Sequence, residues 1–319
     1  LYMETKIREI TAEIGKVIIG KDEVIEKVLT AILAGGHILL EDMPGVGKTT
    51  LALAFSKAMG MSFRRMQFTP DVVPSDIVGF TMYDRQKNEF TYCEGAVMCN
   101  FFLADEINRT SSKTQSALLE VMQEGKATVD GQEHILPQPF IVMATQNPIG
   151  TAGTQKLPEA QLDRFMIKLS MGYPDLNAQA DILRDRGLTD PLDSVELKVT
   201  GEEVMEMKER AKKIYVDDKI YRYIAMLAEA TRDNEYVKLG LSPRGALALC
   251  AMAKATAFVS GRDYVTPEDV NENFRPVCRH RLILMPKARM ADIDEDKLCQ
   301  MILNEIRAPK LDTENEEQI

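Results

Sequence analysis

Short apolar segments alternate with helical patterns through about residue 172, and only helical patterns follow. The apolar segments predict five strands, at residues 37–40, 63–68, 99–104, 140–145 and 166–171. Residues 101–104 are apolar at every position, which is typical of a strand covered on both faces. Together the patterns predict an α/β fold with a doubly wound, parallel, five-stranded sheet, followed by a smaller all-α domain.

Two hairpins interrupt this alternation. Apolar and polar side chains alternate at residues 80–84 and again at 89–93, around a polar turn. Asp130 and Gly131 form the signal of a tight two-residue turn. A helical pattern at 112–124 separates the two hairpins. We therefore expect two β-hairpin insertions that project from the sheet.

The second part of the chain has helical periodicity at residues 202–214, 218–234, 243–259 and 267–281. Proline and polar residues at 173–175 mark its beginning. The sequence thus predicts a core at 1–172, a linker at 173–195, a helical domain at 196–310 and a flexible acidic tail at 311–319.

The charge balance and the cysteine pattern exclude several classes of protein. The 319 residues include 39 basic and 49 acidic ones, a net charge of -10 that opposes loose binding to nucleic acid or anionic membranes. The charged N-terminal sequence and the lack of about 18 consecutive apolar residues predict a soluble, cytoplasmic protein without membrane insertion. The five cysteines form no C-x-x-C pair and the three histidines are far apart, which predicts reduced thiols and no zinc site.

A glycine-rich loop stands between the strand at 37–40 and a helical pattern at 51–59. In a strand–loop–helix unit, backbone N–H groups converge on the β-phosphate, Lys48 reaches the β and γ oxygens, and the Thr49 hydroxyl binds Mg²⁺. The predicted nucleotide-binding residues here are Pro44, Gly45, Val46, Gly47, Lys48, Thr49 and Thr50. The general pattern G-x-x-x-x-G-K-[ST] has glycine where this sequence has Asp42. A glycine-rich turn that binds nothing is the competing interpretation.

An apolar strand at 101–104 ends in two carboxylates, Asp105 and Glu106. About sixty residues after a phosphate loop, this pattern predicts that Asp105 holds Mg²⁺ and that Glu106 activates the water that attacks the γ-phosphate. A solvated strand end is the alternative. The predicted ligands and cofactors are therefore ATP and Mg²⁺.

At this point the sequence resembles the AAA+ ATPases and, within them, the MoxR family, from about Val17 to beyond Gly245. The matching stretches are LLEDMPGVGKT at 39–49, QFTPD at 67–71, PSD at 74–76, ADEINR at 104–109, KTQSALLE at 113–120, ATQNP at 144–148 and LPEAQLDRF at 157–165. Many members of this family look similar at the position of Asp42. The resemblance implies the AAA+ fold, with the C-terminal helices as its lid.

The resemblance also implies roles for three polar residues. Asn147 matches sensor 1, Arg164 matches the arginine finger that acts in a neighbouring subunit, and Arg244 matches sensor 2. Read without the resemblance, Asn147 caps a turn and Arg164 pairs with a nearby carboxylate. For Arg109, a role in trans and a role on the surface have equal support.

Ile18, Ile19 and Gly20 resemble the segment of these proteins that packs on adenine. Without the resemblance, the two isoleucines read as ordinary core residues.

The resemblance implies an Mg²⁺-dependent ATPase whose subunits form a homo-oligomeric ring, most often a hexamer. It further implies a chaperone-like role in maturing or activating client proteins, often ones with a von Willebrand factor A domain, sometimes with metal-cofactor insertion. Three alternatives stay open: a ring motor of the same clade that acts on nucleic acid or as a metal chelatase, a nucleotide-gated scaffold with little turnover, and a small-molecule kinase.

Overall fold

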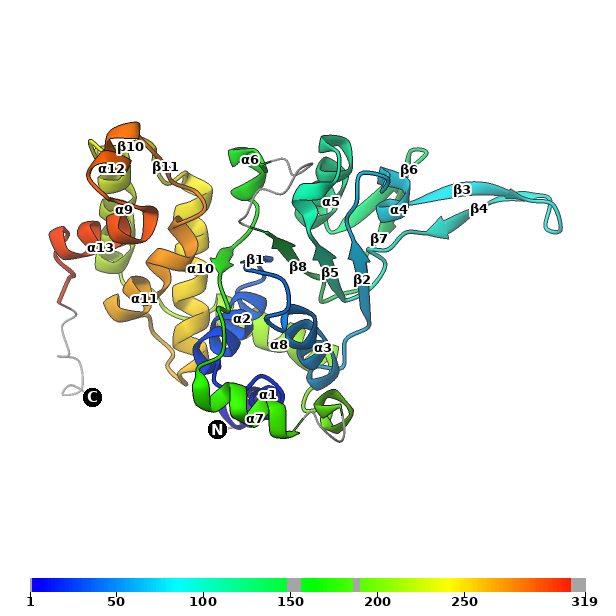
Figure 1. Ribbon diagram of the computed structural model, residues 1–319, viewed down its shortest axis with the longest axis horizontal. Helices are drawn as coiled ribbons and strands as arrows, with labels where there is room; N and C mark the ends of the chain where they lie inside the picture. The colour runs from blue at the N-terminus through cyan, green and yellow to red at the C-terminus, as the bar shows by residue number, and fades with distance from the viewer. Residues whose placement is uncertain (1, 148–155, 186–189, 311–319) are drawn as a thin grey trace, which may run out of the picture. The chain divides into compact units, whose positions relative to one another are not determined.

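The computed structural model describes residues 2–147, 156–185 and 190–310 of the chain. Contacts divide these residues into two compact units, and the division falls between Met207 and Lys208. The first unit contains the large sheet and the second unit is mainly helical (Figure 1). The domain limits expected from the sequence stay predictions, and the predicted tail at 311–319 lies outside the described residues.

The first unit is built on a sheet of five parallel strands in the order β2-β5-β8-β1-β9. Its strands are β1 (Ile38–Glu41), β2 (Phe63–Gln67), β5 (Phe101–Asp105), β8 (Ile141–Gln146) and β9 (Ile167–Leu169). The predicted α/β class and the five parallel strands are therefore confirmed. The strand predicted at 166–171 is shorter, because residues 170–172 leave the sheet and bond to Asp42 instead.

Both faces of this sheet are buried. On one face, Leu39, Phe102 and Val142 belong to an apolar cluster that includes side chains of α4 (Pro74–Val78) and α5 (Ser112–Glu124). The alternate residues Leu40 and Leu103 face the opposite side and are also fully buried. The apolar run of β5 thus belongs to a doubly covered strand, as its sequence predicts.

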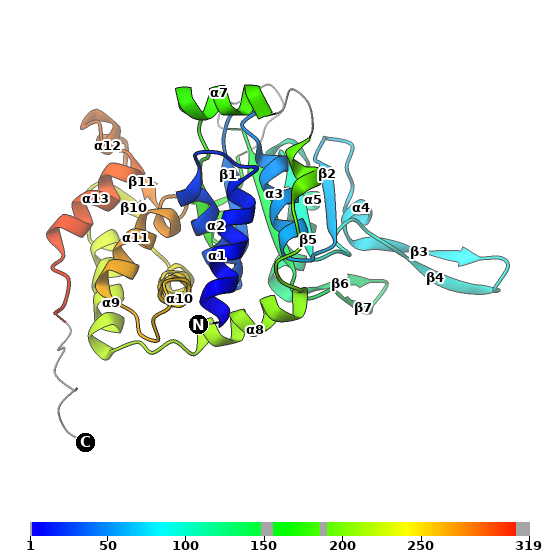
Figure 2. The ribbon, with the colours of Figure 1, turned by 90° about the horizontal axis from the view of Figure 1, so that it is seen from below.

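The helices of the first unit include the ones predicted at residues 51–59, 112–124 and 202–214, together with others for which the sequence analysis gave no bounds. The helices of this unit are α1 (Tyr2–Gly15), α2 (Asp22–Leu33), α3 (Lys48–Ala58), α4, α5, α6 (Glu159–Leu162), α7 (Leu176–Asp185) and α8 (Gly201–Lys212). Residues of α8 belong to both units, because the division falls between Met207 and Lys208. Short 3-10 helices lie at Ile107–Arg109 and Pro191–Ser194. Helix α3 begins at Lys48, three residues before the apolar pattern that predicts it, because Gly47 caps the helix in a left-handed conformation. Helices α1 and α3 lie side by side (Figure 2).

Two hairpins extend from the sheet, as predicted: β3 (Gly79–Asp84) with β4 (Glu89–Glu94), and β6 (Lys126–Val129) with β7 (Gln132–Ile135) (Figure 2). The Tyr92 ring of β4 stacks on the His134 ring of β7, with 3.6 Å between centroids and 9° between planes. The outer part of the first hairpin carries exposed Met82, Tyr83 and Phe90. The hairpins therefore contact each other near their base, whereas the outer part of β3–β4 presents apolar groups to solvent.

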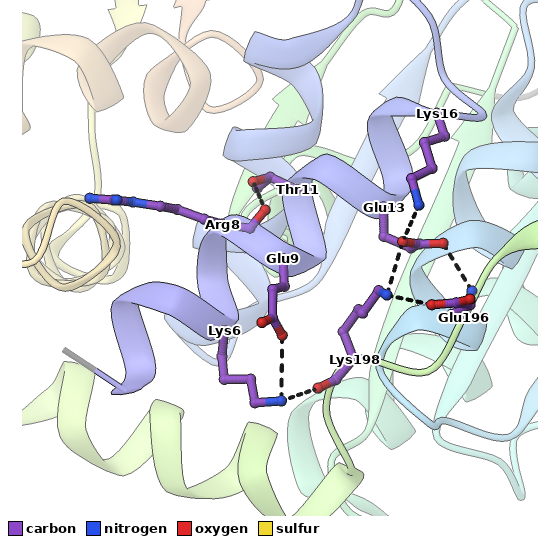
Figure 3. A network of polar contacts seen from close by, with 8 residues as sticks. All are labelled: Lys6, Arg8, Glu9, Thr11, Glu13, Lys16, Glu196 and Lys198. Atoms are coloured by element: carbon purple, nitrogen blue, oxygen red, sulfur yellow. Dashed lines mark hydrogen bonds and ion pairs between the residues drawn. The ribbon is translucent and has the colours of Figure 1, made fainter.

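Helix α1 is fixed to the chain that precedes α8 by a network of polar contacts around Glu13 (Figure 3). Glu13 is 2 % exposed and pairs with Lys16 at 2.7 Å and with Lys198 at 3.2 Å. The backbone N–H of Glu196 donates to the same carboxylate. Burial acts to raise the pKa of Glu13, but these hydrogen bonds outweigh it and lower the pKa to about 2.

The second unit packs helices against one another and carries a small antiparallel sheet. Its elements are α9 (Asp218–Arg232), β10 (Val237–Leu239), α10 (Pro243–Val259), α11 (Pro267–Cys278), β11 (Ile283–Leu284), α12 (Pro286–Met290) and α13 (Glu295–Glu305). Thr266 and Asp269 form a capping box at the start of α11, and Pro267 occupies its first turn. None of the described helices is long and apolar enough to cross a membrane.

The cysteines are all free thiols, in agreement with the sequence. Burial raises the pKa of the Cys99 thiol to about 11, so this cysteine is not a nucleophile at neutral pH. Among the described residues, no group of three or more histidine, cysteine, aspartate or glutamate side chains is placed to hold a metal ion.

Candidate functional site

The residues that sequence analysis selected lie mainly at the carboxyl ends of three adjacent strands. Strand β8 pairs with β5 on one side and with β1 on the other, and all three run parallel. This order places Asp105 at the end of β5, Asn147 directly after β8 and the glycine-rich loop directly after β1. Parallel α/β sheets bind their ligands at this edge.

The glycine-rich loop has the backbone of a phosphate cradle. Gly45 and Gly47 have φ angles of 87° and 96°, in the left-handed region that favours glycine. A Cβ added to Gly45 would meet no other atom within 4 Å, so the loop is open on that side. Lys48 and Thr49 occupy the first turn of α3, where free N–H groups favour anions.

Asp42, the departure from the general pattern, is buried at 5 % exposure beside this loop. Its backbone oxygen accepts a hydrogen bond from Lys48 Nζ at 3.1 Å. Its carboxylate accepts hydrogen bonds from residues 170–172, directly after β9. Sequence reasoning missed this contact, because 128 residues separate Asp42 from Ser170 and only the pairing of β1 with β9 brings them together.

Asp105 is held by two groups that sequence analysis did not select. Arg65 Nη2, from β2, lies 2.6 Å from Asp105 Oδ2, and Thr145 Oγ1, from β8, donates to Asp105 Oδ1 at 2.5 Å. The Asp105 side chain is 13 % exposed. The carboxylate is therefore oriented by neighbouring strands on both sides, with one edge open to solvent.

Glu106 adopts a backbone conformation that is uncommon for a residue with a side chain, with φ 55° and ψ 50°. Its N–H donates to Thr145 Oγ1 at 2.9 Å, so this one threonine contacts both acidic residues. Its carboxylate forms an ion pair with Arg109 Nη1 at 2.9 Å. Strained backbones of this kind cluster at functional sites, where the surroundings hold them in place.

Asn147 follows β8 and lies at the carboxyl end of the sheet, whereas Arg164 precedes β9 and lies toward the amino end. Asn108 Nδ2 approaches the backbone oxygen of Asn147 at 3.5 Å, which places Asn147 next to the loop that carries Glu106. Arg164 follows α6 and precedes β9. Its Nε is buried without a hydrogen-bond partner in the described part of the chain. The ion pair with a nearby carboxylate, the alternative for Arg164, is not found among the described residues.

The segment predicted to pack on adenine begins just after α1. Ile18 is buried at 5 % exposure, Ile19 is half-buried and Gly20 is exposed with a φ of 72°. Lys21 Nζ donates to the backbone oxygen of Tyr173 at 3.0 Å. The segment therefore neighbours the chain that leads from β9 into α7.

Arg244, the sensor 2 candidate, lies in the second unit. It is exposed in the first turn of α10, where Ser242 caps the helix by accepting from the N–H of Gly245 at 3.0 Å. Pro243 occupies the first helical position. The local sequence thus fixes the start of the helix that carries Arg244.

Two family models match this chain. Residues 37–167 match the ATPase family associated with various cellular activities (AAA), and residues 229–301 match the AAA lid domain. The first match runs from the start of β1 to the first residue of β9, and the second lies within the helical unit.

Several known proteins are similar over most of their length. "Chaperone MoxR1" of Mycobacterium tuberculosis is 40% identical over 94% of this chain and 81% of its own, and "Protein MoxR" of Methylorubrum extorquens is 31% identical over 93% of each. A protein of Bacillus subtilis named YeaC is 44% identical over 93% of this chain and 92% of its own. The crystal structure of an ATPase-named protein from Cytophaga hutchinsonii superimposes with a TM-score of 0.90 at 38% identity, over 97% of both chains.

Proposed function

Because this chain belongs to the MoxR family of AAA+ ATPases and is an ATP-hydrolysing enzyme, we propose that it couples Mg²⁺-dependent ATP hydrolysis to the remodelling or activation of a client protein. The observation that carries the catalytic part of the proposal is the strand order β5-β8-β1. It gathers the phosphate loop, Asp105, Glu106 and Asn147 at one edge of the sheet.

The donors at this edge suit Mg²⁺. This ion binds through one or two protein oxygens together with the phosphates of its nucleotide, so it needs no all-protein cluster. Thr49 and Asp105 would hold it, and it would neutralise charge on the β- and γ-phosphates. Lys48 would bind the phosphate oxygens directly, while the N–H groups of residues 45–50 cradle them.

Glu106 is proposed to accept the proton of the attacking water, with Asn147 orienting that water or the γ-phosphate. The left-handed conformation of Glu106 turns the chain sharply at the end of β5, so that the carboxylate leaves the strand beside Asp105. In this structure the carboxylate contacts Arg109 of its own chain. That contact has to loosen before Glu106 takes up a proton.

Arg164 is proposed to complete the active site of a neighbouring subunit in a homo-oligomeric ring, most simply a hexamer. Arg164 Nε is buried with no hydrogen-bond partner among residues 2–147, 156–185 and 190–310, which is unusual because such a group keeps its desolvation cost without a compensating bond. A γ-phosphate supplied from outside the chain is a suitable partner. Arginine fingers of this kind raise the rate of hydrolysis by a factor of about 10³ to 10⁵.

Arg244 is proposed to sense the nucleotide from the lid.

Mixing two inactive variants tests the proposed active site. Glu106→Gln lacks the base and Arg164→Ala lacks the finger, so a mixed ring contains some interfaces with both groups intact. We expect mixing to restore hydrolysis above either parent at equal total protein. If both variants assemble and the mixture stays as inactive as its parents, the assignment of Arg164 is wrong.

The client part of the proposal rests on the similarity to a protein named as a chaperone and on the exposed hairpin β3–β4. Clients with a von Willebrand factor A domain fit this proposal, as does metal insertion into a client. The Glu106→Gln variant should retain a client in the presence of ATP and release it with ADP. Client capture that does not depend on the nucleotide contradicts this part of the proposal.

Added DNA or RNA should leave the rate of ATP hydrolysis unchanged. The cytoplasmic location stays a prediction.

A further inference from the structure

The carboxylate of Asp42 is bonded to a segment of chain far from it in sequence. Ser170 Oγ donates to Asp42 Oδ1 at 2.6 Å, the N–H of Met171 donates to Oδ2 at 2.6 Å, and the N–H of Gly172 donates to Oδ1 at 3.0 Å. We propose that Asp42 is a positioning residue that fixes the phosphate loop against residues 170–172, and thereby against the part of the site that holds the nucleoside. This inference rests on the proposed nucleotide site.

The contact is built for a carboxylate. Asp42 is 5 % exposed, and its three donors are neutral groups that converge on both oxygens. Hydrogen bonds to a charged acceptor are roughly twice as strong as neutral ones. Removal of the carboxylate would leave the N–H groups of Met171 and Gly172 without their acceptor, which is costly for buried groups. The contact therefore holds Asp42 and residues 170–172 in one relative position.

One end of this contact is part of the phosphate loop. Asp42 lies six residues before Lys48, whose Nζ donates to the Asp42 backbone oxygen. The Met171 side chain lies over the loop on the other side, since its Cε is 3.9 Å from the position of a Cβ added to Gly47. Residues 170–172 thus touch the loop through a side chain as well as through the hydrogen bonds to Asp42.

The other end of the contact leads to the proposed adenine segment. Directly after Gly172, the backbone oxygen of Tyr173 accepts from Lys21 Nζ at 3.0 Å. Farther along, Ala178 of α7 is buried, and its Cβ lies 3.1 Å from the position of a Cβ added to Gly20. Residues 170–178 therefore contact both the phosphate loop and the segment at 18–21.

A nucleotide binds tightly only if its phosphates and its base meet their partners together. Residues that fix the distance between the two subsites contribute to affinity without touching the ligand, because preorganisation reduces the cost of ordering the site. The Asp42 carboxylate bonds to residues 170–172, which have no part in the proposed catalytic step. Its loss should therefore weaken nucleotide binding more than it slows the chemical step at saturation.

Asp42→Gly is the sharpest variant, because it restores the glycine of the general pattern. If the loop alone determined binding, this change would be neutral. We expect it to raise the Kd for ATP by about tenfold or more, and the Kd for ADP by a similar factor, because the nucleoside and both inner phosphates are common to the two. The value of kcat at saturating ATP should stay within about threefold.

Ser170→Ala tests the same contact from its other side, at an exposed residue whose loss should leave the fold intact. It removes one of the three donors, so we expect a rise in Kd of about two- to fivefold. Combined with Asp42→Gly, it should add no more than about twofold, because the two residues share one contact. Asp269→Ala is the matched control: it removes a buried aspartate that accepts from Arg262 and Thr266 in the second unit.

The outcomes are distinct. The inference is overturned if Asp42→Gly and Ser170→Ala both leave the Kd for ATP within about twofold of the wild type, if their effects multiply, or if Asp269→Ala weakens binding as much. A loss confined to ATP, with ADP unaffected, would also overturn it, since it would place the effect at the γ-phosphate through Lys48. By contrast, a wild-type protein that binds neither nucleotide would contradict the proposed function itself.

Discussion

The guanidinium of Arg109 lies 2.9 Å from the carboxylate of Glu106 within the same chain. The two residues are three positions apart and enclose the 3-10 turn Ile107–Arg109, so local geometry brings them together. An ion pair of this length holds the carboxylate in one orientation. The carboxylate proposed to activate water is therefore restrained by Arg109.

Arg109→Ala should raise the basal rate of ATP hydrolysis. Without the ion pair, the Glu106 carboxylate can turn toward the γ-phosphate. Because the Arg109 side chain is 43% exposed, the effect should be modest, about two- to fivefold in kcat. Steady-state hydrolysis at saturating ATP measures it. In a Glu106→Gln background the substitution should change nothing. A loss of more than about tenfold would indicate instead that Arg109 acts in trans on a neighbouring site.

Arg65→Ala should lower the Mg²⁺ concentration that gives half-maximal hydrolysis. Arg65 is the cation nearest Asp105, at 2.6 Å, and its charge opposes the binding of a second cation there. Its side chain is 46% exposed, so solvent screening limits the expected change to about two- to fivefold. Arg64→Ala is the control, because Arg64 pairs with Glu94 and lies on the same strand. An increased Mg²⁺ requirement in Arg65→Ala would show that Arg65 supports the site rather than competing at it.

Glu13→Gln should reduce stability in a way that depends on pH. The folded-state pKa of Glu13, about 2, lies below the ordinary value of 4.5, so the carboxylate stabilises the fold above about pH 5. That contribution is lost as the pH falls from about 5 toward 2. At pH 7 the variant should lose about 2 to 3 kcal/mol, measured by urea unfolding, and the difference from wild type should shrink at pH 3.

Glu196→Gln is the matched control for this network. The Glu196 carboxylate is 72% exposed and pairs with Lys198, so its removal should change the free energy of unfolding far less than Glu13→Gln does at pH 7. If the two variants behave alike, or if the loss in Glu13→Gln is the same at pH 3 and pH 7, the ionised Glu13 does not fix helix α1 as described.

Tyr92→Ala should loosen both hairpins. Tyr92 stacks on His134 and donates its hydroxyl to the backbone oxygen of Val78 at 2.6 Å. Hydrogen exchange should become faster in residues 79–94 and also in 126–135, because the stack joins the two ribbons. Tyr83→Ala removes the contact between Tyr83 and Phe90 nearer the tip and should speed exchange in the first hairpin alone. Equal patterns for the two variants would show that the stack does not couple the hairpins.

Much of the fold could be predicted because local chemistry and tertiary structure agree in it. The helix at 112–124 has its predicted bounds, since Ser111 caps its start and Gly125 ends it in a left-handed conformation. The phosphate loop has its predicted place between a strand and a helix for the same reason. The short elements are different: α6, β10 and β11 carry too few residues for a periodic pattern, so packing determines them.

The sequence by itself determined the class of the molecule: a parallel sheet, a loop for phosphates, and a pair of carboxylates at a strand end, because each depends on residues that are close together in the chain. Tertiary structure alone decided which groups hold those residues. Arg65 and Thr145 reach Asp105 only because β2 and β8 flank β5, and Asp42 meets Ser170 only because β9 pairs with β1. Periodicity reports which face of an element is buried, whereas the order of strands in a sheet sets which distant side chains meet.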